Sequence, residues 1–316
     1  MRAHRILRVS LVGALLALFT GACGGQAASD SKPEKQKIQV RVLRVIDTAP
    51  FFLARKNGFF ADEGLTVDPV SIKDVTKALP KLRSGDIDVT FGNYVTFFRS
   101  YANGNRLHIA AEGYNAESGV LSVMAIPGSG LREPEDLAGK TIAVNNVKHI
   151  GTLTVKSVLR THDVDLDSVD FVDVPFTEMD TALVDGSVDA AWMVEPFISV
   201  AKQKLGAHRV LDAASGATKG FPIAGYATTQ KFYEKNPKTV AAFQRALQRA
   251  QRLAHDRAKV ERILPQYTEI NKQTAALVTI GKYPTTVDAR RLQRVADAMR
   301  RFGILEERLD VRKLIG

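Results

Sequence analysis

The stretch Leu82-Arg83-Ser84-Gly85-Asp86-Ile87-Asp88-Val89 returns 101 residues further along the chain as Leu183-Val184-Asp185-Gly186-Ser187-Val188-Asp189-Ala190. In both copies a helical segment ends at a glycine, which can adopt the left-handed conformation that follows many helices. A short apolar strand comes next, over 87–91 in the first copy and 188–193 in the second. The repeat therefore indicates a β/α unit that is written twice.

The residues around each copy extend this unit to strand, helix, strand, helix, strand. β-rich runs over 39–46 and 141–144 open the two halves. Short apolar strands that alternate with helices are typical of parallel sheets covered on both faces. Runs at 120–126 and 225–229 are interpreted as strands that cross between the halves. The remaining residues, 237–302, are predicted to be almost wholly helical.

We therefore expect an α/β protein of two lobes with a cleft between them. The first lobe would comprise residues 38–124 and 225–316, and the second would comprise residues 125–224. About 280 residues are enough for one large domain or two medium ones. A mature chain whose only cysteine is Cys23 forms no internal disulfide, so buried apolar surface must stabilise it.

The N-terminus is interpreted as a secretory leader over residues 1–22. Three arginines precede an apolar run at 9–19, and small residues lead into Cys23, the only cysteine of the 316 residues. The run is too short to span a bilayer as a mature helix. The pattern resembles the bacterial lipoprotein box, in which the cysteine is lipidated, although Thr20 stands where an aliphatic residue is usual. The alternatives are an ordinary signal peptide with a chance cysteine, or a short buried apolar segment.

Residues 23–37 are expected to form a flexible tether, because 26–37 hold no aromatic or branched apolar side chain. Removal of the leader takes away three arginines and no acidic residue, which changes the net charge from +10 to +7. The basic excess is concentrated in 231–262, where Arg245, Arg249 and Arg252 fall on one helical face. A solvated helix face is the simplest interpretation. Attraction to anionic lipid is the alternative, and nucleic acid is not expected because no recognition motif is present.

Four segments follow predicted strands and precede predicted helices: 47–51, 92–96, 145–152 and 192–197. Ligands of open α/β sheets bind beyond the carboxyl ends of the strands. Helix N-termini there offer free N–H groups that can hold sulfonate, nitrate, phosphate or carboxylate. The predicted ligand-binding residues are Thr48, Pro50, Phe51, Asn93, Tyr94, Asn146, Gly151, Thr152, Trp192 and Glu195.

Several of these residues have a structural alternative. Thr48 and Thr152 could cap helices instead of contacting a ligand. Trp192 could fill the core, or could face Tyr94 across the ligand. Glu195 could accept hydrogen bonds from an amine or protonated heterocycle, or could be a favourable charge at a helix N-terminus. Lys148 and His149 could pair with an anion, but exposed loop charges are common.

The opening of the body, 47–67, resembles the solute-binding proteins of ABC importers, in the branch that handles sulfonates, taurine, nitrate and thiamine-precursor pyrimidines. Its markers are Pro50, Ala54, Gly58-Phe59-Phe60 and Gly64-Leu65-Thr66-Val67. The stretches Gly85-Asp86-Ile87-Asp88, Pro134 to Val144 and Glu195-Pro196-Phe197 fit as well, so the similarity spans roughly 40–233.

The resemblance implies a two-lobed periplasmic-binding fold of type II with two crossovers. It also implies that the lobes close about a hinge on one small solute, and that the closed form docks on an ABC permease served by its ATPase. We expect a monomer without cofactor or metal, held outside the cytoplasm by its N-terminal lipid. Closure shifts an existing equilibrium, because contacts from both lobes exist together only in the closed state.

The solute class is open between two sets of residues. Anion-binding members of the family tend to use hydroxyls, amides and main-chain N–H groups, which Thr48, Asn93, Asn146 and Thr152 would supply. Pyrimidine binders place aromatics and a carboxylate around the ring, as Tyr94, Trp192 and Glu195 would do. The aromatic pair with an acid favours a small nitrogen-containing or aromatic solute over a bare sulfonate.

Two rival functions use the same fold. A related eukaryotic branch makes the thiamine pyrimidine, but it carries a cysteine-rich motif, and this mature chain has no cysteine beyond Cys23. Gly-x-Ser-x-Gly is absent, and the six histidines lack metal-ligand spacing; His149 alone is predicted inside the cleft. We therefore do not expect an enzyme. A lobe pair that reports the ligand to a membrane signalling partner would need the same cleft.

Overall fold

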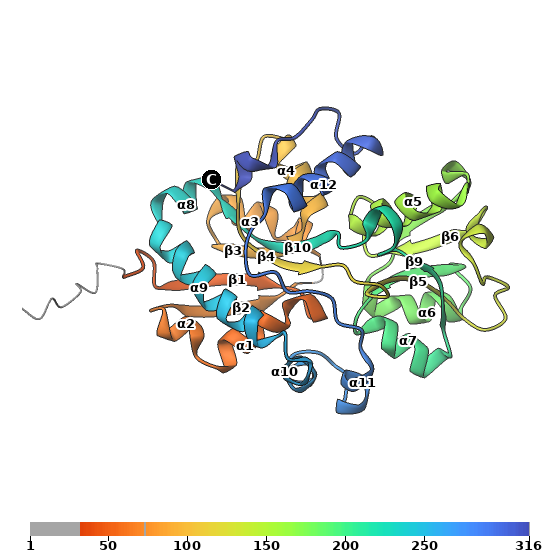
Figure 1. The fold of residues 1–316 in the computed structure, drawn as a ribbon, viewed down its shortest axis with the longest axis horizontal. Helices are drawn as coiled ribbons and strands as arrows, with labels where there is room; N and C mark the ends of the chain where they lie inside the picture. Colours follow the sequence, from red (N-terminus) through yellow and green to blue (C-terminus); the bar gives the residue numbers. More distant parts are fainter. Residues whose placement is uncertain (1–31, 73, 316) are drawn as a thin grey trace, which may run out of the picture. The chain divides into compact units, whose positions relative to one another are not determined.

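The computed structural model describes residues 32–72 and 74–315, which contain two five-stranded sheets (Figure 1). The first has the order β2-β1-β3-β10-β4, with β1 (Lys37–Val42), β2 (Thr66–Ser71), β3 (Val89–Asn93), β4 (Leu107–Asn115) and β10 (Pro222–Thr229). The second has the order β7-β6-β8-β5-β9, with β5 (Leu121–Ala125), β6 (Thr141–Val144), β7 (Asp170–Asp173), β8 (Ala190–Val194) and β9 (His208–Asp212). The expected two-lobed α/β fold is confirmed.

The sequence repeat is one structural unit in both lobes. In lobe 1, β1 pairs in parallel with β3, with Val40 opposite Val89. In lobe 2, β6 pairs in parallel with β8, with Ile142 opposite Ala190. The second strand of each unit, β2 or β7, pairs in parallel on the outer side of β1 or β6.

The matching aspartates of the repeat, Asp88 and Asp189, align these strands. The Asp88 carboxylate accepts a 2.9 Å hydrogen bond from the amide of Gln39 in β1. The Asp189 carboxylate accepts one of 2.9 Å from the amide of Thr141 in β6. The amides of the two aspartates donate to the carbonyls of the same two residues, at 3.0 Å in both lobes. Each aspartate therefore exchanges two hydrogen bonds with the neighbouring strand.

The sheets are mixed, whereas the sequence pattern predicted parallel ones. β10 runs antiparallel to β3 and β4, and β5 runs antiparallel to β8 and β9. A strand that arrives from the other lobe starts at the edge where the neighbouring parallel strands end, so it must run in the opposite direction.

The described chain crosses between the sheets at 116–120 and at 213–221, which agrees with the two crossovers that were expected. The first crossing lies before the predicted boundary at residue 124, because β5 pairs with β8 and β9 in the second sheet. The predicted return strand at 225–229 is the end of β10.

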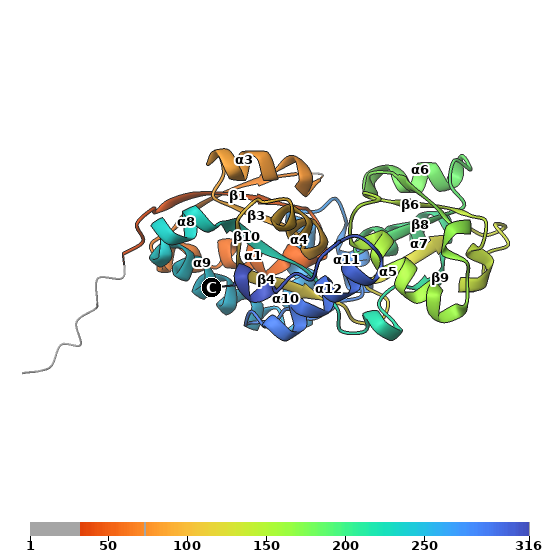
Figure 2. The ribbon, with the colours of Figure 1, turned by 90° about the horizontal axis from the view of Figure 1, so that it is seen from above.

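Helices cover both sheets. In the first half of lobe 1 these are α1 (Ala49–Lys56), α2 (Phe59–Asp62), α3 (Leu79–Ser84) and α4 (Tyr94–Ala102). Lobe 2 has α5 (Ile150–Leu159), α6 (Met179–Val184) and α7 (Phe197–Leu205). The C-terminal part has α8 (Gln230–Lys235), α9 (Pro237–Leu253), α10 (Arg257–Ile263), α11 (Lys272–Leu277) and α12 (Ala289–Arg301). Figure 2 shows α3 and α9 on opposite faces of the first sheet.

The basic face of α9 is partly neutralised within lobe 1. Arg245 Nε lies 2.7 Å from Glu63 Oε2. Arg249 Nη2 lies 2.9 Å from Asp62 Oδ2, and its guanidinium lies 4.1 Å from the centroid of the Phe59 ring. These contacts attach α9 to α2 and favour a structural role for the arginines over a lipid-binding one.

The predicted leader over 1–22 and Cys23 lie outside the described residues, as does most of the predicted tether. The tether prediction is wrong for the last residues before β1. The Glu34 carboxylate accepts hydrogen bonds from the amides of Lys238 (3.1 Å) and Thr239 (2.9 Å) at the start of α9. The Lys35 amide donates to the Thr239 hydroxyl at 2.9 Å. A carboxylate is favourable at a helix N-terminus, so this segment is bound to lobe 1.

Among the helices of the described residues, none combines the length and the apolar character that crossing a membrane would need.

We expect Asp88→Ala to destabilise the protein more than Asp189→Ala. Asp88 is 3% exposed and its carboxylate also binds Lys35 Nζ at 2.7 Å, whereas Asp189 is 42% exposed and lies 3.9 Å from Lys140 Nζ. Losing hydrogen bonds to a buried charge costs about 2 kcal/mol, while the exposed pair contributes about 1 kcal/mol or less. Urea unfolding measures both values, and equal losses would contradict this assignment.

Candidate functional site

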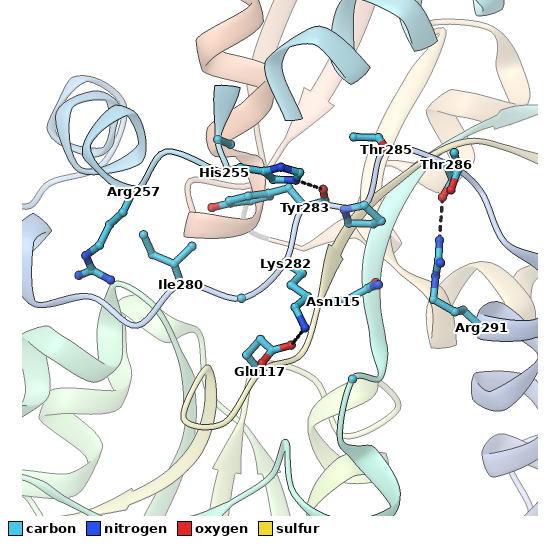
Figure 3. Close-up of a pocket in the computed structure, with 14 residues that line it drawn as sticks. Asn115, Glu117, His255, Arg257, Ile280, Lys282, Tyr283, Thr285, Thr286 and Arg291 are labelled. Carbon is cyan, nitrogen blue, oxygen red and sulfur yellow. Dashed lines mark hydrogen bonds and ion pairs between the residues drawn. The ribbon is translucent and has the colours of Figure 1, made fainter. Parts of the chain in front are cut away.

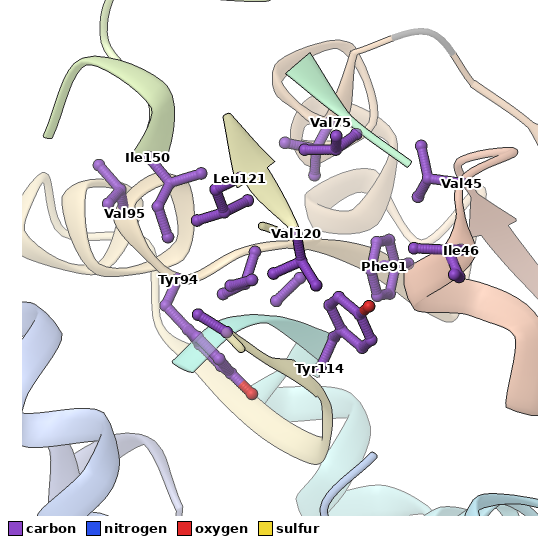
Figure 4. Packing of buried hydrophobic residues seen from close by; sticks show 14 of the residues in the cluster. Val45, Ile46, Val75, Phe91, Tyr94, Val95, Tyr114, Val120, Leu121 and Ile150 are labelled. Carbon is purple, nitrogen blue, oxygen red and sulfur yellow. The ribbon is translucent and has the colours of Figure 1, made fainter. Parts of the chain in front are cut away.

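The strand ends of the two lobes contact each other directly. The amide of Ile46, after β1, donates to the carbonyl of Glu195, after β8, at 3.2 Å. Arg99 Nη1 on α4 donates to the Lys148 carbonyl, before α5, at 3.1 Å. Apolar side chains fill the space between the lobes, and Figure 4 shows Ile150 of α5 near Val95 and Tyr94 of α4. The lobes are therefore closed on each other along this boundary.

Three predicted residues after β1 are held within lobe 1. The Thr48 hydroxyl donates to the carbonyls of Leu43 (2.8 Å) and Val45 (2.9 Å). Pro50 is buried in the first turn of α1. Phe51 is fully buried, and its ring centroid lies 5.5 Å from that of Phe60. These side chains shape the loop and the core of lobe 1.

Asn93 and Tyr94 also have partners inside lobe 1. Asn93 Oδ1 caps α4 by accepting hydrogen bonds from the amide (2.9 Å) and hydroxyl (3.0 Å) of Thr96. The Tyr94 ring stacks on Phe98, with 5.8 Å between the centroids. The Tyr94 hydroxyl lies against Gly225 of β10, and it has no hydrogen-bond partner. The Tyr94 side chain therefore packs against residues of lobe 1.

The loop before α5 shapes the lobe 2 side. Asn146 Oδ1 accepts a 2.9 Å hydrogen bond from the Lys148 amide. The Trp192 ring packs on the backbone of Gly151, where an added Cβ would lie 2.9 Å from the ring. Trp192, and not a ligand, thus makes the close approach to the main chain for which a glycine is needed at position 151. Trp192 Nε1 and Thr152 Oγ1 are buried and have no hydrogen-bond partner.

His149 adds a third unpartnered polar group to this region. It is 1% exposed, it precedes α5, and neither ring nitrogen has a hydrogen-bond partner. Its Nε2 lies 4.0 Å from Asp74 Oδ1 of lobe 1. Burial lowers the pKa of His149 to about 4, and the nearby charge of Arg99 adds to this, while Asp74 and Asp173 oppose it. The ring is therefore neutral at pH 7, and it could donate one hydrogen bond and accept another.

Glu195 ties lobe 2 to the C-terminal part. It is 1% exposed, and its peptide bond to Pro196 is cis. Its Oε1 accepts hydrogen bonds from the Ser199 hydroxyl (3.0 Å) and the Thr279 amide (2.9 Å), and its Oε2 accepts one from the Ser199 amide (3.1 Å). Burial raises the pKa of Glu195. Both oxygens are thus engaged within the protein.

Asp47 is a buried acid that was not among the predicted ligand-binding residues. It is 6% exposed, and it forms no salt bridge among the residues that the structure describes. Burial raises its pKa to about 7. Asp47 belongs to a segment nominated from the strand ends, but an acid before a helix is usually interpreted as a favourable helix charge. Its surroundings come from distant parts of the chain, so local sequence carries no signal for them.

A cavity of about 470 Å³ opens at the lobe boundary. Arg44 and residues between Thr268 and Thr274 line it from lobe 1, and Phe176 and Phe197 line it from lobe 2. Phe176 stacks on Phe197 with 5.2 Å between the centroids, and lies 5.9 Å from Trp192. Aromatic surface therefore leads from this cavity toward Trp192.

A second cavity, of about 820 Å³, lies beside the crossings (Figure 3). Asn115 and Glu117 line it at the first crossing, and Gly220 at the second, while Lys282 and Tyr283 come from residues 264–287, which we call the C-terminal segment. Lys282 Nζ lies 2.7 Å from Glu117 Oε1, and Asn115 pairs with Lys282 through backbone hydrogen bonds of 2.9 and 3.1 Å. We call this the hinge cavity.

The sequence profile of a family described as NMT1/THI5 like matches residues 45–259. YtlA of Bacillus subtilis (strain 168), which carries the provisional name of a binding protein, is 25% identical over 269 residues. These cover 78% of this chain and 74% of that protein.

Two solved structures show the same fold. One is the ligand-binding component of an ABC-type import system from Staphylococcus aureus with zinc bound. It has a TM-score of 0.76 at 14% identity, covering 89% of this chain and 97% of that one. The other is the alkanesulfonate-binding protein SsuA from Xanthomonas axonopodis pv. citri bound to MOPS, with a TM-score of 0.74 at 17% identity, covering 90% and 99%. At these identities the similarity shows the fold alone, which is that of the periplasmic binding proteins.

We expect Asp47→Asn to stabilise the ligand-free protein at pH 8 and to have little effect at pH 4. Folding raises the pKa of the Asp47 carboxyl from 3.8 to about 7. Its contribution to the free energy of unfolding is therefore fully present below pH 3.8, and it is lost as the pH rises through about 7. The loss is at most about 4 kcal/mol above pH 7, and asparagine avoids it. Urea unfolding at both pH values measures the difference.

Asp86→Asn, at an exposed carboxylate, serves as the control for removing one negative charge. A gain from Asp47→Asn that is equal at pH 4 and pH 8, or absent at pH 8, would show that this carboxyl does not titrate as its burial requires.

Proposed function

Because the chain belongs to the NMT1/THI5-like family, we propose that it is the solute-binding component of an ABC importer, capturing one small solute by hinge closure and delivering it to a membrane permease. The observation that carries this proposal is the closed boundary between the lobes, where His149, Thr152 and Trp192 have buried polar atoms without partners. Buried polar groups are nearly always hydrogen-bonded. A solute held between the lobes would supply the missing partners.

The proposal includes the place of the protein in the cell. The leader over 1–22 would direct export, and lipid on Cys23 would hold the protein at the outer face of the cell membrane, beside its permease and ATPase. The protein would act there as a monomer and would release the solute unchanged, so it is not an enzyme. Support for the anchor comes from the sequence pattern alone.

We favour a nitrogen heterocycle of the pyrimidine type over taurine, other sulfonates or nitrate. Aromatic rings dominate the lobe 2 side of the boundary, where Phe176 lies between Phe197 and Trp192. A planar ring can stack on such surfaces. Of the residues predicted from sequence, Tyr94, Thr152 and Trp192 have buried polar atoms without a hydrogen-bond partner. The polar side-chain atoms of Thr48 and Glu195 form hydrogen bonds within the protein.

We expect 4-aminopyrimidine compounds to raise the melting temperature and to change the fluorescence of Trp192, the only tryptophan. Ligand at 100 times its Kd stabilises the folded state by about 2.7 kcal/mol. Thermal unfolding and emission titrations would compare these compounds, thiamine among them, with taurine, methanesulfonate and nitrate.

Three results would contradict parts of the proposal. Stabilisation by taurine, methanesulfonate or nitrate alone would exclude the heterocycle. A tight ligand that leaves the emission unchanged would remove Trp192 from the site. Conversion of a bound compound to product would make the protein an enzyme on the same fold.

A further inference from the structure

The carboxylate of Asp47 lies in lobe 1 without a cation to balance it. The residues that the structure describes form no salt bridge to Asp47, although it is 6% exposed. Taking a carboxylate out of water is unfavourable unless it is paired or becomes protonated. Such a residue therefore needs either a proton or a positive group from outside the chain.

Four tyrosines from separate parts of lobe 1 lie near enough for the charge of Asp47 to act on their hydroxyls. Tyr114 is on β4, Tyr226 is on β10, and Tyr267 and Tyr283 are in the C-terminal segment. Burial raises the pKa of all four hydroxyls, and the negative charge of Asp47 adds to the rise. The Tyr226 hydroxyl is buried and has no hydrogen-bond partner. Aromatic side chains near a carboxylate form a chemical environment that attracts organic cations.

Two of the other three tyrosine hydroxyls hold the loop that carries Asp47. Tyr267 donates to the Val45 carbonyl at 3.0 Å, and Tyr283 donates to the Ile46 carbonyl at 2.9 Å. The C-terminal segment thus fixes the main chain immediately before Asp47 and leaves the carboxylate itself without a side-chain partner.

Asp47 also lies next to the lobe boundary. The amide of the preceding residue, Ile46, donates to the carbonyl of Glu195 in lobe 2. Burial raises the pKa of Tyr114, and the charges of Asp47 and Glu195 add to the rise, so both carboxylates lie near this hydroxyl. Tyr283 lines the hinge cavity. An anionic group placed here would be repelled by both carboxylates.

We propose that Asp47 and its four tyrosines form the subsite that receives a positively charged nitrogen of the solute. This inference rests on the proposed function and narrows its solute to an organic cation. The carboxylate would balance the charge, the rings would contribute cation–π attraction, and the Tyr226 hydroxyl would be available for a hydrogen bond.

The test uses thiamine and choline, which carry a permanent positive nitrogen, and 3,3-dimethylbutanol, the uncharged counterpart of choline. We expect the purified protein to bind at least one of the two cations at pH 8, and Asp47→Asn to weaken that binding at least tenfold. Asp47→Glu should restore part of the affinity, and Asp86→Asn should leave it unchanged. Circular dichroism would establish that the variants are folded.

The pH dependence gives a second readout. With a carboxyl pKa of about 7, affinity for a permanent cation should rise roughly tenfold from pH 6 to pH 8, and Asp47→Asn should abolish this rise. The titratable groups on which the charge of Asp47 acts are Tyr114, Tyr226, Tyr267 and Tyr283, and Glu195 acts on Tyr114 as well. The tyrosines have raised pKa values and remain neutral over this range.

Four other outcomes would each overturn the inference. Equal cation binding by Asp47→Asn and wild type at pH 8 rejects the subsite and leaves the import function standing. Binding of taurine or nitrate without either cation does the same. Equal affinity for choline and 3,3-dimethylbutanol shows that charge is not recognised. A protein that binds none of the compounds in either panel overturns both proposals.

Discussion

The pairing of β1 with β3, and of β6 with β8, depends on one aspartate in each lobe. Asp88 and Asp189 hold the neighbouring strand through one side-chain and one backbone hydrogen bond. Gly85 and Gly186, three residues before these aspartates, allow the chain to turn out of a helix. Each aspartate then fixes where the next strand pairs. The loops after β1, β3, β6 and β8, which meet at the lobe boundary, start from strands whose register is set in this way.

The C-terminal segment is the second constraint, because it binds both lobes and the hinge. Thr279 donates to Glu195 of lobe 2, Lys282 pairs with Asn115 at the first crossing, and Tyr283 holds the loop after β1. Movement of one lobe against the other must alter some of these contacts. The same segment supplies two of the tyrosines around Asp47, which places the proposed subsite where lobe movement and solute binding would be coupled.

Sequence reasoning predicted the duplicated unit, the two crossovers and the segments that meet at the boundary, because these depend on local patterns of glycine and apolar residues. It could not predict where side chains point. Tyr94 follows a strand as expected, yet its ring turns back onto Phe98, one helical turn later. Glu195 lies at the boundary, but an amide 84 residues away occupies its carboxylate. The enclosure of Asp47 depends on tyrosines that only the tertiary fold brings together.

The position of β10 has a consequence for how the chain folds as it is made. Every strand of the second sheet lies within residues 121–212, so that lobe can complete its sheet from one continuous stretch. The first sheet cannot, because among the described strands β4 pairs with β10 alone, and β10 begins at Pro222. β4 therefore has no strand to pair with until β10 has been synthesised, after the second lobe. Contacts between residues so far apart in the sequence form slowly.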